Sequence, residues 1–163
     1  MNVISRTRYS RNCTNDTFPL PSIVDCLWYA FTEVGEVVDA RLRMAQPAHL
    51  RNNARNVDPR HETGQVLYML ASAYVQVRRD DSFQPWGAGM GETELDFAIA
   101  EACHYTVAAI ADTMLGDENG VSIMLAMRAW CNVCVVADWN ADQLIDETCA
   151  EFEKKHCVVR EVL

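Results

Sequence analysis

Helical periodicity is the sequence feature that most constrains this fold. Along most of the chain, apolar residues recur every three or four positions, the spacing of one helix face. No stretch alternates between apolar and polar residues as a half-buried strand does. The 163 residues, half of them hydrophobic, provide one substantial core and leave no room for a second domain. The sequence therefore predicts an all-α protein, a bundle of four to five helices.

Capping and turn residues bound the expected helices. Pro19 and Pro21 close an irregular N-terminal arm, and Ser22 is a suitable N-cap for the helix that follows. Asp58 before Pro59 places an N-cap directly ahead of a proline at the first helical position. We expect an arm at 1–21 and one helical domain at 22–163, with helices over 22–44, 59–79, 92–115, 121–137 and 141–156.

The periodicity also assigns faces. The first helix should turn Ile23, Leu27, Ala30, Val34, Val37 and Ala40 or Leu42 inward. The third should turn Leu95, Ile99, Cys103, Val107 and Ile110 inward. The fourth is apolar nearly all round, which is typical of a helix inside a bundle or at a subunit contact. We expect a homo-oligomer, either a dimer or a tetramer built from dimers.

Charge and cysteine content exclude several classes of protein. A net charge of −9 argues against a general nucleic-acid binder, which needs a basic surface. No run of 18 apolar residues and no signal peptide are visible, so we expect a cytoplasmic protein without membrane association. The seven cysteines are odd in number and several lie in apolar helical runs, as reduced thiols do.

Three glutamates form the most informative constellation. Glu33 and Glu36, in FTEVGEVVDA, lie one turn apart on one helix face among apolar neighbours. Glu62 begins the second helix and meets the first pair if the two helices pack antiparallel. Carboxylates so grouped suit a hard cation such as Mg²⁺ that bridges to phosphates. The alternative is that Glu33 and Glu36 are solvated and that Glu62 is a first-turn acid favoured by the helix dipole.

The segment EVGEVVDA, followed after a polar spacer by ETGQVLYMLA, resembles the MazG-like all-α nucleoside triphosphate pyrophosphohydrolases, whose pattern is ExxE, spacer, ExxD. The resemblance covers about residues 22–79. The stretch WNADQLIDETCAEFEKKHCVVR is similar, more loosely, to the last helix of that family. Lys154 or Lys155, and Arg160, match its phosphate-facing positions.

The resemblance implies hydrolysis of a nucleoside or deoxynucleoside triphosphate to the monophosphate and pyrophosphate. Water would attack the α-phosphorus, and one of the glutamates would accept its proton. Glu33, Glu36 and Glu62 would hold Mg²⁺, with Mn²⁺ as an alternative, to neutralise phosphate charge and orient the water.

One position departs from the family pattern, because Gln65 stands where the family has aspartate. An amide oxygen ligates a metal without adding charge and cannot act as a base, so metal affinity and rate should fall. Asp39, Asp80 or Asp81 are candidate substitutes. The alternatives are a nucleotide-binding or regulatory bundle with weakened or lost turnover, and a structural interaction protein in which the acids are incidental.

Arginines between the two acidic motifs reverse the local charge, and guanidinium groups match phosphate oxygens. They are Arg41, Arg43, Arg51, Arg55 and Arg60. Of these, Arg51 and Arg55 are the candidate triphosphate ligands in the loop, the alternative being a solvated loop whose arginines balance neighbouring acids.

Aromatic residues and cysteines add weaker candidates. Trp28, before Glu33 and expected on nearly the same face, could stack on a base, although aromatic residues at helical spacing are more often core. Trp86 is a second, weaker stacking candidate, and Trp130 and Trp139 are expected to be structural. A CxxC at residues 131–134 indicates zinc or, more simply, small thiols packed in a core, and His104 is expected in the core or at an interface.

Overall fold

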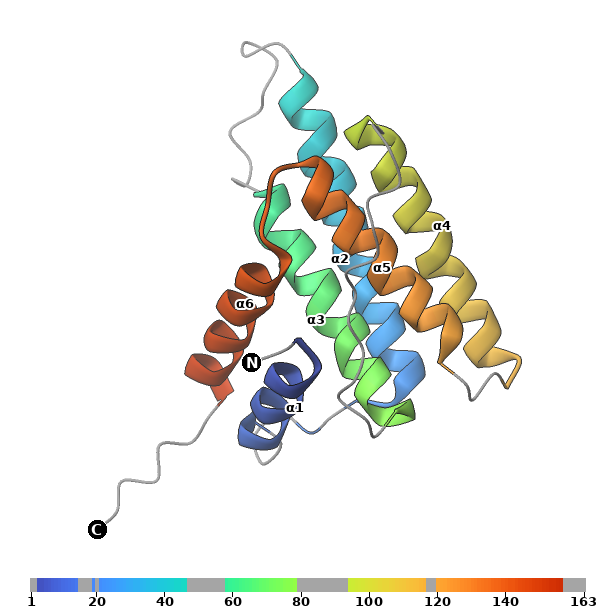
Figure 1. The fold of residues 1–163 in the computed structure, drawn as a ribbon, viewed down its shortest axis with the longest axis vertical. Coiled ribbons are helices and arrows are strands. Elements are labelled where there is room, and N and C mark those ends of the chain that lie inside the picture. The colour runs from blue at the N-terminus through green and yellow to red at the C-terminus, as the bar shows by residue number, and fades with distance from the viewer. Residues whose placement is uncertain are drawn as a thin grey trace.

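The computed structural model describes residues 3–14, 19, 21–46, 58–78, 94–116 and 120–156, and these residues form helices and short connections without a strand (Figure 1). The helices are α1 (Val3–Thr14), α2 (Ile23–Ala45), α3 (Pro59–Val77), α4 (Leu95–Met114), α5 (Val121–Val136) and α6 (Ala141–His156). The all-α prediction is confirmed. The expected number of four to five helices is wrong, because the described residues hold six.

The additional helix is α1, which occupies most of the segment expected to be irregular. Its inward side is largely polar, which is why apolar periodicity did not reveal it. Thr7 and Ser10 are buried there, and Arg11 donates from Nε to the Ser72 hydroxyl at 2.8 Å. The Arg11 guanidinium also lies 4.6 Å from the centre of the Tyr68 ring. Helix α1 therefore depends on partners in α3 that are distant in the sequence.

Three of the other helices, α2, α3 and α6, begin at the capping residues that the sequence indicates. The Ser22 hydroxyl accepts from the Asp25 amide at 3.1 Å, and the Asp58 carboxylate accepts from the Arg60 amide at 3.0 Å. The side-chain oxygen of Asn140 accepts from the Gln143 amide at 3.1 Å. These bonds satisfy amide donors that a helix start leaves without an intrahelical partner.

Four helices form a closed ring in which each packs on the next, in the order α2, α3, α5, α4 and back to α2. Helices α1 and α6 pack on each other and on α3. In Figure 1, α2 and α3 run antiparallel, and α4 lies at the edge of the bundle. Helix α3 thus contacts four other helices, whereas α4 contacts only α2 and α5 among the described helices.

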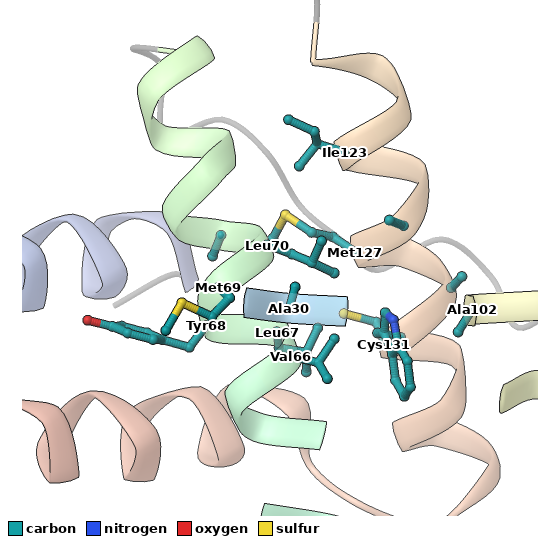
Figure 2. Packing of buried hydrophobic residues seen from close by; sticks show 14 of the residues in the cluster. Ala30, Val66, Leu67, Tyr68, Met69, Leu70, Ala102, Ile123, Met127 and Cys131 are labelled. Carbon is teal, nitrogen blue, oxygen red and sulfur yellow. The ribbon is translucent and has the colours of Figure 1, made fainter. Parts of the chain in front are cut away.

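The core lies inside this ring. Figure 2 shows Leu70 of α3 and Met127 of α5 meeting between their helices, and both side chains are fully buried. Trp130 is also fully buried, and its indole N–H donates to the Thr106 hydroxyl at 3.0 Å. Side chains of this size contribute about 1.5–3 kcal/mol each when removed from water. The structural role expected for Trp130 is confirmed, and Trp139 packs against the same core.

One residue expected on an inner face needs correction, and one open alternative is resolved. Val107, expected inward on α4, is 49% exposed, and on α2 it is Ala40 that is buried while Leu42 is 61% exposed. Helix α5 is buried in part: nine of its 16 residues are covered within the chain, whereas Val121, Leu125 and Val135 are exposed. Cys131 and Cys134 are free, buried thiols on α5, which confirms the core-packing interpretation. Burial raises the pKa of Cys134 to about 12, so the reactive thiolate is disfavoured.

Within the described residues, no single helix has both the length and the apolar composition needed to cross a membrane. Helices α5 and α6 pass that test only when taken together, and they are bent by 109° at the break between them.

Candidate functional site

The antiparallel packing of α2 and α3 brings two glutamates from distant parts of the sequence together. Glu33 lies midway along α2 and Glu62 in the first turn of α3. Both side chains are half-buried, and their carboxyl groups share a hydrogen bond. Glu36, also half-buried and one turn further along α2, acts on both through its charge. The structure therefore groups the three sequence-predicted acids where α2 and α3 pack together, and this cluster of Glu33, Glu36 and Glu62 is here called the acidic groove.

The electrostatics of Glu33 follow from this placement. Burial raises its pKa from 4.5 to about 7, with further increases from the Glu62 charge, from the hydrogen bond to Glu62 and from the Glu36 charge. Near neutral pH the Glu33 carboxyl is therefore close to half-protonated. A proton held there can be donated to Glu62, so that the two groups form an acid–carboxylate pair.

The pKa of Glu62 is also raised, chiefly by burial and then by the Glu36 charge. The neighbouring His61 and the hydrogen bond from Glu33 act in the opposite direction. Two carboxyl groups that both resist ionisation lie beside a third, so the groove favours an added positive charge, either a proton or a cation.

The oxygen-only chemistry of these groups fits Mg²⁺. No group of three or more His, Cys, Asp or Glu side chains in the described ranges is arranged to hold a metal ion. A protein-bound Mg²⁺ commonly takes one or two carboxylates and completes its coordination with water and substrate phosphates. The Glu33–Glu62 pair supplies the kind and number of carboxyl groups that this mode of binding uses, and Glu36 adds a third charge beside them.

Gln65, the departure from the family pattern, is engaged by a neighbour on its own helix. Its amide nitrogen lies 2.7 Å from Nε2 of His61, one turn earlier. The same ring nitrogen is 3.7 Å from Oε2 of Glu151 on α6, and Lys155 donates to the other oxygen of Glu151 at 2.5 Å. A polar chain of Gln65, His61, Glu151 and Lys155 thus borders the acidic groove.

Sequence reasoning missed His61 and Glu151. A usable signal existed for His61, which precedes Glu62 directly and stands four residues before Gln65, where helical side chains meet. No local signal points to Glu151, because its contact depends on α6 packing against α3. Arg60 and Glu147 tie the same helices together with an ion pair at 2.8 Å.

Lys154 and Lys155 are both exposed on α6, and Lys155 is the one connected to the His61 network through Glu151. Arg51, Arg55 and Arg160, the other predicted phosphate ligands, lie outside the described residues, as do Asp80, Asp81 and Trp86.

Trp28 is not placed as expected. Five residues along an α-helix correspond to about 140° around its axis, so Trp28 and Glu33 do not share a face. Trp28 is 48% exposed rather than core, and its ring packs edge-on against Phe31 at a centroid distance of 6.1 Å. A base stacked there would lie away from the α2–α3 groove.

Of the arginines between the two acidic motifs, Arg41, Arg43 and Arg60 lie in the described residues, and each pairs with an acid. Arg41 binds Asp96 at 2.7 Å and Arg43 binds Asp39 at 2.7 Å, in addition to the Arg60 pair. The charge-balancing interpretation therefore describes these three arginines. It also removes Asp39 as a substitute for the missing aspartate, because its carboxylate is directed to Arg43.

No family model, curated protein or solved structure matches the chain. The likeness to MazG-like enzymes thus rests on the sequence motifs alone.

Proposed function

We propose that the protein is a Mg²⁺-dependent nucleoside triphosphate pyrophosphohydrolase that converts a nucleoside or deoxynucleoside triphosphate and water to the monophosphate and pyrophosphate. The observation that carries the proposal is the half-buried meeting of the Glu33 and Glu62 carboxyl groups beside Glu36. Natural helices rarely bring acids together in this way without a function, because like charges at short range raise the free energy of the folded state.

Glu33 and Glu62, with Glu36 beside them, are the groups that would hold Mg²⁺, which supplies charge neutralisation and orients the attacking water. Glu33 is suited to accept a proton near pH 7, because a base works best when its pKa lies near the working pH. The hydrogen bond from Glu33 keeps Glu62 the more readily ionised of the pair and so the better anionic ligand.

The polar chain next to this groove provides the remaining contacts. Lys155 lies beside Glu151, and release of that ion pair would free its ammonium group for a phosphate oxygen. Gln65, held by His61, contributes no charge, so the site works with fewer carboxylates than the family pattern has. We therefore expect slower turnover than an ExxD site would support.

The deciding measurement is pyrophosphate release from each ribo- and deoxyribonucleoside triphosphate, with Mg²⁺ or Mn²⁺. Glu36→Gln should abolish metal-dependent release while leaving the fold intact. Glu101→Gln, a change of one partly buried carboxylate on α4, is the matched control and should leave turnover unaltered. Unchanged activity in Glu36→Gln would remove that acid from the mechanism.

Gln65→Asp restores the aspartate of the family pattern and tests the role of this position directly. If this position faces the metal, the new carboxylate should raise the rate at limiting Mg²⁺ and lower the metal concentration needed for half-maximal activity. A fall in activity would mean instead that the Gln65 contact with His61 is required.

A nucleotide-binding bundle without turnover is the second candidate, favoured by the contact that holds Gln65 to His61 instead of leaving it free for a metal. A melting temperature that rises with triphosphate and Mg²⁺, without any pyrophosphate release, would select this candidate over the enzyme. Neither release nor a thermal shift would contradict both.

A further inference from the structure

Helix α4 carries a continuous exposed row without a charged residue. Six of its exposed residues form this row, here called the α4 seam: Phe97, Ala100, His104, Val107, Ala111 and Met114. Phe97 is 67% exposed, Val107 49% and Met114 64%. The seam lies on the solvent-exposed side of α4, and Ala100 borders α2. Figure 1 shows α4 at the edge of the bundle. It accounts for most of the exposed α4 side chains, so the solvent side of α4 is largely apolar, unlike that of an ordinary surface helix.

The spacing of the seam is that of a coiled coil. Its members alternate in steps of three and four residues over the whole helix, which is the heptad pattern that keeps a seam directed at a partner helix. A helix that only fills one edge of its own bundle has no need of such a row on its solvent side. The partner that this spacing fits is another helix lying along α4.

The order of side-chain sizes identifies that helix as a second copy of α4. Read from either end of the seam towards its middle, the side chains are first large, then small, then intermediate in size. Reversal about its midpoint therefore pairs residues of matching size: Phe97 with Met114, Ala100 with Ala111, and His104 with Val107. A two-fold axis would generate this antiparallel pairing, because it places the same surface of each copy against the other in opposite directions. The pairing joins a sulfur to an aromatic ring at each end and lets small residues bring the backbones together between them.

Helix α2 extends the same face. The α2–α4 groove has a volume of about 350 Å³ and is lined by Leu42 and Ala100, among others, and by the paired charges of Arg41 and Asp96. Phe31 lies on the same side of α2 as Leu42, since 11 residues bring a helix back to within about 20°. Both side chains are exposed. Apolar surface thus flanks the seam on its α2 side.

The available area is sufficient for a stable contact. Helix α4 has 20 residues and is therefore about 30 Å long. With the flank of α2 packed about 9 Å away, the strip is roughly 20 Å wide, or about 600 Å² on each copy. Two such strips reach about 1,200 Å², the lower end of the range for specific interfaces.

We propose that two copies of this chain associate through the α4 seam, antiparallel about a two-fold axis between His104 and Val107. The absence of charge along the seam favours this occupant, because a copy brings no ionic group that would need a partner. The proposal stands independently of the acidic groove, which lies between α2 and α3.

Sedimentation over a wide concentration range tests the proposal, with circular dichroism to confirm that each variant is folded. The wild-type chain should show a concentration-dependent dimer. Ala111→Glu should raise the dimer dissociation constant about a hundredfold, because symmetry buries two unpaired charges that each cost about tenfold. Tyr9→Glu is the matched control and should leave the dimer unchanged. Tyr9 is 56% exposed and lies on α1, a helix that does not contact α4.

A charge-pair exchange tests the orientation. Ala100→Lys alone should weaken the dimer, whereas Ala100→Lys combined with Ala111→Glu should restore it, because antiparallel pairing places each lysine opposite a glutamate. In a parallel pair, like charges would face each other and the double variant would be the weakest. A wild-type monomer at all concentrations, a dimer insensitive to Ala111→Glu, or a double variant weaker than both single variants would each overturn the proposal.

Discussion

Helices α3 and α4 have almost the same length, 19 and 20 residues, yet they occupy opposite environments. Helix α3 is surrounded by α1, α2, α5 and α6, whereas α4 packs on α2 and α5 only. Eleven α3 residues are buried against six in α4, although α4 is at least as apolar in composition. The difference shows that position in the ring, more than composition, decides which apolar residues are covered.

Truncation of one large side chain on each helix should give the largest contrast. Leu67→Ala on α3 removes a fully buried side chain and should lower the free energy of unfolding by about 3 kcal/mol through lost burial and a cavity. Met114→Ala on α4 should change it by less than about 0.5 kcal/mol in the monomer, because that side chain is largely in solvent. Urea unfolding at low protein concentration measures both, and equal losses would contradict the contrast.

Two helical glycines extend the comparison to a crowded position on α3 and an open position on α2. A Cβ at Gly64 of α3 would lie 2.7 Å from the Thr148 hydroxyl and 3.2 Å from the Leu144 carbonyl oxygen, so Gly64→Ala should destabilise by about 1–3 kcal/mol through overpacking. A Cβ at Gly35 of α2 would meet nothing within 4 Å, so Gly35→Ala should stabilise by about 0.5–1 kcal/mol through helix propensity. Thermal unfolding of both variants gives the signs, and like signs would argue against the close contact of α3 with α6.

The acidic groove between α2 and α3 should make the free energy of unfolding depend on pH. The pKa of Glu33 in the folded protein, about 7, lies above its ordinary value of 4.5. Stability from the protonated carboxyl is therefore complete below pH 4.5 and is lost as the pH rises through 7. Glu33→Gln should match wild type in acid and exceed its stability above pH 7 by about 1 kcal/mol, after allowance for solvent screening.

Urea unfolding at several pH values measures this difference, with Glu101→Gln on α4 as the control. Added Mg²⁺ should stabilise the wild type above pH 7 more than it stabilises Glu33→Gln. A pH-independent difference between wild type and Glu33→Gln would contradict the acid–carboxylate pair.

The smallest effect is expected at the ion pair that joins α2 to α4. Arg41 and Asp96 are both substantially exposed, so Arg41→Gln should lower the free energy of unfolding by about 0.5 kcal/mol or less. A double-mutant cycle with Asp96→Asn isolates the pair. A coupling as large as the Leu67 effect would mean that α4 is held by charge instead of by apolar packing.

Much of the secondary structure was predictable because its signals are local. The Ser22, Asp58 and Asn140 caps each mark a helix start through bonds that span two or three residues. Helix α1 escaped prediction because its buried side is polar and its partners, such as Ser72, come from α3. The Val107 error arose because an apolar residue at helical spacing indicates a face without indicating whether anything covers it.

The candidate site was predictable to the same extent. The three-residue spacing placed Glu33 and Glu36 on one helix face. The short connection between the first two helices predicted that Glu62 would meet this pair, and the antiparallel packing of α2 and α3 brings Glu62 to Glu33. The contacts of Gln65 with His61, and of His61 with Glu151, required the position of α6. The metal and the reaction stay predictions.

By itself, the sequence determined the helical class, most helix starts and the acidic pair on α2, because these depend on interactions within a few residues of one another. Only the tertiary structure decided that α1 is a helix, which side of α5 is covered within the chain, and that the heptad row of α4 is exposed. The physical reason is that burial belongs to pairs of elements. A side chain leaves water only when a particular neighbour arrives, and the identity of that neighbour is not written in the residues beside it.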